Sequence, residues 1–213
     1  MPNYQLINEK MLSVTLANEE VFAKSGAMVG YTGDVAFQRS FLTGAGVQEL
    51  AMRAVTNEGL AMMKARGKGN VLYAYDGGFV TIVQVQGETL YVESETLLAF
   101  DSRLKPGTMF IGNQGGVQGI LRGAVSGQGL FTTTLEGTGE AVIISDGNAI
   151  GLEVKPDRPV FVDPNAYIGH KGQVSSQIVT DLGWKTMVGQ ASGESYQVKF
   201  TGQGTVYIQA SER

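Results

Sequence analysis

The residues that could carry catalytic chemistry are few. His170 is the only histidine, and an imidazole can act as a general base or as a metal ligand. The carboxylate pairs Glu93/Glu95 and Asp157/Asp163 could share acid–base work or bind a cation, but their spacing fits no known metal-binding loop. The chain has no cysteine, which excludes thiol catalysis, thiolate metal sites and disulfides. The sequence therefore predicts no catalytic, cofactor-binding or metal-binding residue, and we expect a protein that is not an enzyme and holds no cofactor.

A basic stripe is the candidate for binding an anion or RNA. Lys64, Arg66 and Lys68 alternate with small residues, so on a strand all three would point to one face. A ring-wide RNA groove would need this charge in every copy of a repeated unit. The corresponding positions in two related stretches of the chain are Thr134, Glu136, Thr138, Lys199, Thr201 and Gln203. We therefore favour a solvated strand face, with an anionic partner as the alternative.

Three glycine pairs and one tryptophan complete the candidates. A phosphate-binding loop needs a helix after its glycines, whereas here strand-forming residues lie on both sides, so we expect bulges or tight turns. Trp184 is expected to pack in the core or in a subunit contact, with ligand anchoring as the alternative. The glycine pairs are Gly67/Gly69, Gly137/Gly139 and Gly202/Gly204.

The composition limits the partners. The chain has 213 residues, 43% of them hydrophobic, and a net charge of −4, which argues against binding DNA or an anionic membrane surface. No basic segment followed by an apolar run opens the sequence, so no secretory signal is predicted. No apolar stretch approaches the roughly 20 residues that span a bilayer. We expect a soluble cytoplasmic protein without a membrane span.

The glycine content indicates a β protein. Thirty glycines separate short runs of Val, Ile, Leu, Thr and aromatic residues, which is typical of many short strands joined by tight turns. Asp76-Gly77-Gly78 and Asp146-Gly147-Asn148 each lie between apolar runs. Because Asp and Gly tolerate the positive φ of tight turns, both segments are predicted to be hairpin turns.

The chain carries an internal repeat. Residues 46–77 align with 116–147 without a gap, and 11 of the 32 pairs are identical, where chance would give roughly two or three. A third copy follows at a shift of 65 residues. A stretch with conserved aliphatic and ring positions also recurs as VFAKSGAMVGY, LYVESETLLAF and VFVDPNAYIGH, beginning at positions 21, 90 and 160. We therefore predict three related units of about 70 residues, 1–74, 75–144 and 145–213.

The repeat decides two ambiguous assignments. Residues 47–66 have helical propensity, but the aligned residues 117–136 contain four interior glycines and a run of threonines, so both are predicted to be strands. The positions aligned with His170 are Tyr31 and Phe100, so this histidine is predicted to fill a ring-shaped space in the core rather than to do chemistry.

The combined pattern resembles a known family. The segments GQGLFTTTLEGTGEAVII at 127–144 and SGESYQVKFTGQGTVYIQ at 192–209 are similar to the domain-of-unknown-function family that includes a fungal altered-inheritance-of-mitochondria protein. The resemblance covers nearly the whole chain. It implies an all-β fold of three tandem domains like the trp RNA-binding attenuation protein (TRAP), which are short, jelly-roll-like variants of the double-stranded β-helix. It also implies a ring of three chains and nine domains, and it offers no established enzymatic activity to carry over to this chain.

These observations predict a protein that acts by association. Three similar edges in one chain favour a closed ring of copies, because head-to-tail contacts close when the rotation permits. We expect a non-enzymatic scaffold or interaction protein that forms a homotrimeric ring with itself as the main partner. The alternative is binding of a small ligand or single-stranded RNA by analogy with the attenuation protein, although the missing repeated charge disfavours RNA.

Overall fold

A computed structural model describes residues 1–41, 61–110, 131–179 and 197–210. These residues form an all-β structure with a single 3₁₀ turn, η1 (Ser94–Thr96), and no α-helix within the described ranges. Trp184 and the part of the predicted strand at 47–60 lie outside the described residues. The remaining residues of that prediction, 61–66, lie in a strand, which confirms the β assignment over the helical propensity.

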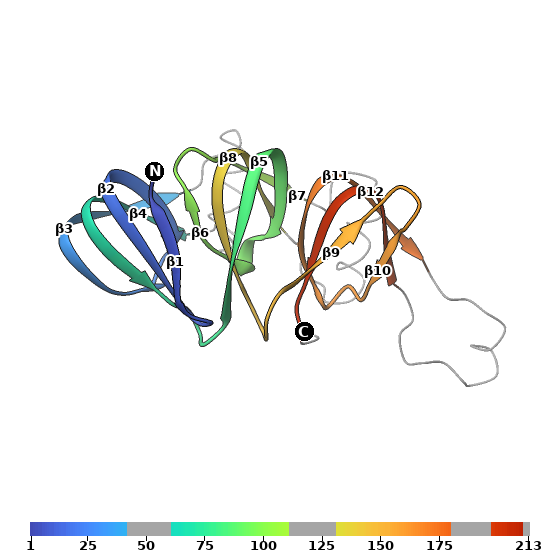
Figure 1. Cartoon of the computed structure of the whole chain (residues 1–213), viewed down its shortest axis with the longest axis horizontal. Coiled ribbons are helices and arrows are strands. Elements are labelled where there is room, and N and C mark those ends of the chain that lie inside the picture. Colours follow the sequence, from blue (N-terminus) through green and yellow to red (C-terminus); the bar gives the residue numbers. More distant parts are fainter. Residues whose placement is uncertain (42–60, 111–130, 180–196, 211–213) are drawn as a thin grey trace.

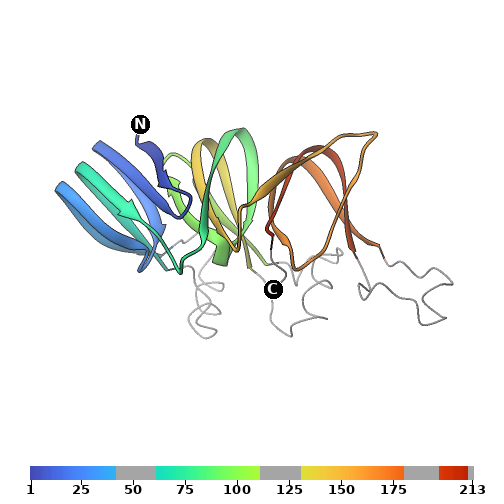
Figure 2. The same ribbon diagram turned by 60° about the horizontal axis from the view of Figure 1, so that its bottom comes forward.

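The strands form three groups that follow one another along the long axis of the molecule (Figures 1 and 2). The first group contains β1 (Asn3–Asn8), β2 (Met11–Lys24), β3 (Met28–Phe41) and β4 (Ala61–Tyr73). The second group contains β5 (Phe79–Glu93), β6 (Leu97–Asp101), β7 (Lys105–Phe110) and β8 (Phe131–Ser145). The third group contains β9 (Ile150–Val154), β10 (Val160–Val162), β11 (Tyr167–Val179) and β12 (Gln197–Ile208).

The last strand of each group lies in its centre. β4 pairs with β2 on one side and β3 on the other, and β8 pairs with β5 on one side and with β6 and β7 on the other. β12 pairs with β9 and β10 on one side and with β11 on the other. All these pairings are antiparallel, so each group is a strongly curved sheet built on one long central strand.

Two short strand pairings join the groups into one sheet. β2 of the first group pairs with β6 of the second through Phe22↔Phe100. β5 of the second group pairs with β11 of the third through Tyr91↔His170. We call these pairings the first junction and the second junction. The resulting path through the sheet begins at β10 and ends at β3.

Two of the three hydrophobic clusters among the described residues extend from one strand group into the next. One cluster combines first-group residues such as Leu12 and Val14 with Leu98 and Val142 of the second group. A second cluster packs second-group residues against Ile168 of the third. The third cluster contains residues of the third group alone. Burial therefore couples neighbouring groups, as expected for units too small to hold a full core by themselves.

The glycine pairs lie where neighbouring strands approach closely, and two of the three pairs lie at bulges, as predicted. The first glycine of each pair has a positive φ, which is 146° for Gly67, 123° for Gly137 and 111° for Gly202. Gly67 and Gly137 lie opposite register shifts in β2 and β5. A Cβ on Gly67 would lie 2.1 Å from the carbonyl oxygen of Asp34 in the neighbouring strand. Only glycine fits there, so the pair shapes the sheet and is no phosphate loop.

The predicted hairpins at Asp76 and Asp146 are wrong in one respect. The first segment is a tight turn, since the Gly78 amide donates to the Tyr75 carbonyl at 3.0 Å, and Asp76 and Gly77 have φ of 48° and 66°. Within the described residues, the flanking strands β4 and β5 are not partners, and neither are β8 and β9. Both segments connect successive groups. Turn chemistry is local, whereas strand pairing depends on the distant central strand.

Candidate functional site

His170 is a packing residue at the second junction. Its ring is 6% exposed and stacks on Tyr91 with centroids 4.7 Å apart and planes inclined by 10°. Its Nδ1 lies 2.6 Å from the Tyr167 hydroxyl. Burial lowers the pKa of His170 to about 4, so the ring is neutral at pH 7. These contacts agree with the predicted ring-filling role.

The carboxylates considered for acid–base work differ in burial and in their local contacts. Glu93 is buried, whereas Glu95 is exposed. Asp163 accepts a hydrogen bond from the Asn165 amide at 2.7 Å and closes the turn before β11. Asp157 is exposed in the turn bridged by Lys155 and Arg158. Within the described ranges, no group of three or more His, Cys, Asp or Glu residues could hold a metal ion.

The basic stripe lies on the central strand β4. Lys64 and Arg66 both approach Glu20 Oε1 of β2, at 3.5 and 3.6 Å. Lys68 lies opposite Ala17 and Asp34 in the register. Arg66 is two-thirds exposed, so its ion pair with Glu20 is a surface interaction of small energy. A carboxylate thus lies between two of the three cations and offsets their charge.

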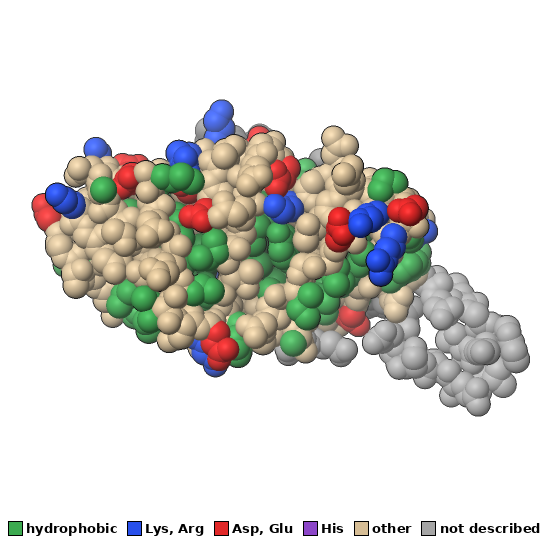
Figure 3. All heavy atoms as spheres, viewed as in Figure 1, with side chains coloured by type: hydrophobic (Ala, Val, Ile, Leu, Met, Phe, Trp, Pro, Cys, Tyr) green, Lys and Arg blue, Asp and Glu red, His purple; other side chains and the backbone are tan. Residues whose placement is uncertain are grey.

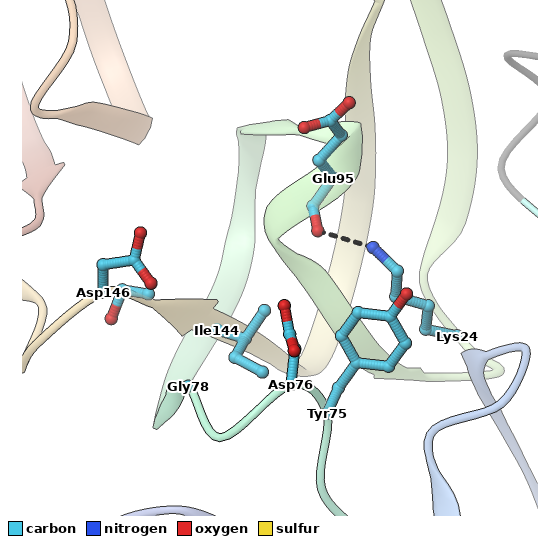
Figure 4. Close-up of a pocket in the computed structure, with 8 residues that line it drawn as sticks. Lys24, Tyr75, Asp76, Gly78, Glu95, Ile144 and Asp146 are labelled. Carbon is cyan, nitrogen blue, oxygen red and sulfur yellow. Dashed lines mark hydrogen bonds between the residues drawn. The ribbon is translucent and has the colours of Figure 1, made fainter. Parts of the chain in front are cut away.

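A surface pocket of about 400 Å³ lies beside the first junction (Figure 4). Lys24 is one of the residues that line it, and its Nζ donates to the Glu95 carbonyl oxygen at 2.7 Å and sits 4.6 Å from the centre of the Tyr75 ring. Asp76 and Asp146 add two carboxylates to the rim. Lys24 thereby ties the β2–β3 turn to the second group, which gives this pocket a structural role.

The two junctions share one construction. At the first junction Phe22 stacks on Phe100, with centroids 5.2 Å apart and planes inclined by 16°. At the second junction Tyr91 stacks on His170 in the same place of the register. Each junction therefore consists of a short antiparallel pairing and one cross-strand stack of rings.

Each junction also has its own polar contacts. At the second junction, Lys171 donates to Glu88 Oε1 at 2.9 Å and to the Gln84 carbonyl oxygen at 2.6 Å. At the first junction, Asp101 is fully buried and accepts a two-point contact from Arg103, with Nε at 2.9 Å and Nη2 at 2.6 Å. The two contacts differ in residue type and direction, so they distinguish one junction from the other.

The open ends of the sheet path expose apolar residues that sequence reasoning did not single out. Val29 and Tyr31 on β3 are 54% and 50% exposed, and Phe161 on β10 is 50% exposed. Ile150 on β9 is 53% exposed. The alignment of the three stretches already contained Val29, Tyr31 and Phe161, but a sequence does not say which copy of a position stays uncovered. These end surfaces are the candidate interaction site.

The fold and the end surfaces define a class of protein: an all-β protein built on one antiparallel sheet, with exposed apolar residues at both ends of the strand order. The chain belongs to the mitochondrial biogenesis AIM24 family, whose pattern matches residues 4–211. The crystal structure of protein SPYM3_0169 from Streptococcus pyogenes is similar, with a TM-score of 0.71 and 20% identity over 100% of this chain and 94% of that one. No curated protein matches the chain significantly. Within the described residues, no helix is long and apolar enough to cross a membrane.

Proposed function

We propose that this protein is a non-enzymatic scaffold or interaction protein that assembles as a homotrimeric ring. In this proposal the chain consists of three tandem TRAP-like units, residues 1–74, 75–144 and 145–213, each a short double-stranded β-helix variant. One observation carries the proposal. The strands that would form a third junction of the same kind are exposed at the two ends of the chain's own sheet.

The first half of that third junction is β10. Phe161 lies opposite Lys199 of the central strand β12, as Phe22 lies opposite Lys64 of β4. Phe22 and Tyr91 are partly covered by the next group, whereas Phe161 is 50% exposed. Phe161 therefore occupies the position whose aromatic side chain stacks on a partner at the two internal junctions. No aromatic side chain from the described part of the chain stacks on its outer side.

The second half is β3. Tyr31 lies opposite Val71 of the central strand, as Phe100 lies opposite Ala141. Phe100 is fully buried at the first junction, whereas Tyr31 is 50% exposed. The positions two residues before Tyr31 and Phe100 show the same contrast, since Val29 is 54% exposed and its counterpart Leu98 is fully buried.

A second copy of the chain complements both ends. Antiparallel pairing of β10 with β3 of the next copy would place Phe161 on Tyr31, in the register of the two internal junctions. The contact is head to tail, so it forms a ring if the rotation closes and a filament if it does not. The family resemblance favours closure at three copies, which gives nine units.

Size-exclusion chromatography with light scattering tests the assembly. We expect a mass of three times 22.6 kDa for the wild type and a shift to monomer for Val29→Asp and Phe161→Asp, because a buried unpaired carboxylate opposes association. Ile7→Asp is the matched control, since Ile7 is 56% exposed but lies on β1, away from both ends. A wild-type monomer at working concentrations would refute the ring.

The alternative, binding of a small ligand or single-stranded RNA, rests on Lys64, Arg66 and Lys68. The ion pairs of Glu20 with Lys64 and Arg66 support the first proposal over this one. A rise in melting temperature with a single-stranded RNA at low salt, lost in Arg66→Glu, would favour the alternative.

A cytoplasmic location remains part of our proposal, and cell fractionation tests it against the mitochondrial link in the family's description.

A further inference from the structure

The outer edge of a strand is here the edge that faces away from the central strand of its group. In the first group, the outer edge of β2 is covered by β1, which pairs through Asn3↔Thr15, Tyr4↔Val14 and Gln5↔Ser13. Tyr4 is 7% exposed, and the other five residues of β1 are exposed. The added strand therefore contributes main-chain hydrogen bonds and one inward aromatic anchor.

The outer edge of β5 in the second group is satisfied differently. The Val80 amide donates to the Glu9 carbonyl at 2.8 Å, and the Gln84 carbonyl accepts from Lys171 Nζ at 2.6 Å. Main-chain groups of an antiparallel strand alternate between its two edges, so Val80, Ile82 and Gln84 face outward. A backbone contact and a lysine thus protect this edge.

The outer edge of β9 in the third group has neither kind of protection from the described residues. β9 lies on its central strand in the same register, since Leu152↔Val206 corresponds to Val14↔Val71. By the same alternation, the main-chain groups of Gly151 and Glu153 face outward. Within the described ranges β9 pairs with β12 alone.

The side chains around this edge leave it accessible. Ile150, Gly151 and Glu153 are exposed, and Leu152 is half-buried. Figure 3 shows hydrophobic side chains gathered on the visible face over β5 and β9. Lys171 protects the outer edge of β5 at the second junction. In the proposed ring, Thr32 of the next copy would take the corresponding place beside β9, and a threonine has no ammonium group to cap that edge. An exposed edge with a small residue and an apolar neighbour is a template for strand addition.

We propose that β9 binds an extended segment of a partner protein, added antiparallel to its outer edge as β1 is added to β2, with an aromatic side chain opposite Leu152. Strand addition is a common mode of peptide recognition, in which main-chain bonds supply affinity and a side-chain anchor supplies selectivity. Pro156 and Pro159 follow β9 and limit the pairing to about five residues. The site does not depend on the ring, so a monomer that binds the segment would support this proposal while refuting the assembly.

A peptide with the sequence of residues 1–9 is the probe, titrated against the full chain by fluorescence anisotropy. We expect saturable binding, with at least a tenfold loss of affinity for the Tyr4→Ala peptide. N-methylation at the Gln5 position, whose amide would face β9, should abolish binding. N-methylation at the Leu6 position, whose amide would face away, is the matched control and should leave binding in place.

The Gly151→Pro variant locates the site on the protein. It removes an amide from the outer edge, where proline is tolerated, and should abolish peptide binding without a change of melting temperature. Hydrogen exchange on the wild type gives a second readout that needs no variant, with protection expected at Gly151 and Glu153 when peptide is added. Absence of saturable binding, or binding unchanged in Gly151→Pro with no protection of these amides, would overturn the proposal.

Discussion

Tyr91 and His170 stack across the second junction with ring centroids 4.7 Å apart and planes inclined by only 10°. The two rings come from strands almost 80 positions apart in the sequence, and they meet because β5 and β11 pair at this point. Phe22 and Phe100 stand in the same relation at the first junction. Ring stacks at the junctions therefore connect the repeat in the sequence with the contact between strand groups.

Acid should weaken the protein through His170. Burial lowers the pKa of His170 to about 4 from 6.5, so the unfolded state binds a proton in this window that the folded state does not. Stability should fall as pH drops from 6.5 towards 4, by about 3 kcal/mol in all. In His170→Phe this component should be absent. Urea unfolding of both proteins between pH 4.5 and 7.5, at one protein concentration, measures the difference.

The comparison with His170→Phe controls for the carboxylates. A hydrogen bond from the chain's amino group lowers the pKa of Glu19, so its contribution is lost as pH falls below 4.5, equally in both proteins. A pH dependence identical in the two proteins would show that His170 is not the group responsible.

Removal of Arg103 should destabilise the first junction. Asp101 is fully buried and Arg103 supplies its two-point ionic contact, so Arg103→Ala leaves a buried carboxylate with fewer partners. We expect a loss of about 2–4 kcal/mol in the free energy of unfolding. Arg103→Ala combined with Asp101→Asn should recover part of that loss. If the single variant unfolds at the same urea concentration as the wild type, the contact does not stabilise the junction.

Gly67 should tolerate no side chain. Its φ of 146° lies outside the range of other residues, and a Cβ would approach the Asp34 carbonyl to 2.1 Å. Gly67→Ala should cost about 2–3 kcal/mol or more, measured by thermal or urea unfolding. Gly77→Ala separates the two causes, since Gly77 has a φ of 66° and a Cβ added there would meet nothing within 4 Å, and it should cost about 1 kcal/mol.

The lack of cysteine allows a covalent test of the contact between copies. In the double variant Tyr31→Cys with Phe161→Cys, the only possible disulfides involve these two positions. Directly opposite residues of an antiparallel pair have Cβ atoms about 4.5–5.5 Å apart, close to disulfide geometry. Oxidation should give a ladder on a non-reducing gel that ends at three copies. Each single variant can form only dimers and is the control, and a ladder that continues past three would indicate a filament.

Much of the fold could be predicted because its signals are local. The glycine pairs predicted bulges or tight turns, and Gly67 and Gly137 lie opposite register shifts and adopt positive φ. The stretch that recurs from position 90 folds as strand, turn and strand, since β5, η1 and β6 follow in that order. The pairing of the strands was less accessible, because the tight turn at Asp76 looks the same whether its flanking strands pair or separate.

The sequence by itself determined the β architecture, the equivalent positions of the aromatic or imidazole side chains of Tyr31, Phe100 and His170, and the absence of thiol chemistry. Only the tertiary structure decided which of these rings are covered: Phe100 and His170 are buried by a neighbouring strand group, and Tyr31 is half exposed at the end of the sheet. The physical reason is that residue type sets what a position can pack, whereas burial depends on which strand lies next to it. Equivalent positions thus become core in the middle of the chain and an exposed surface at its ends.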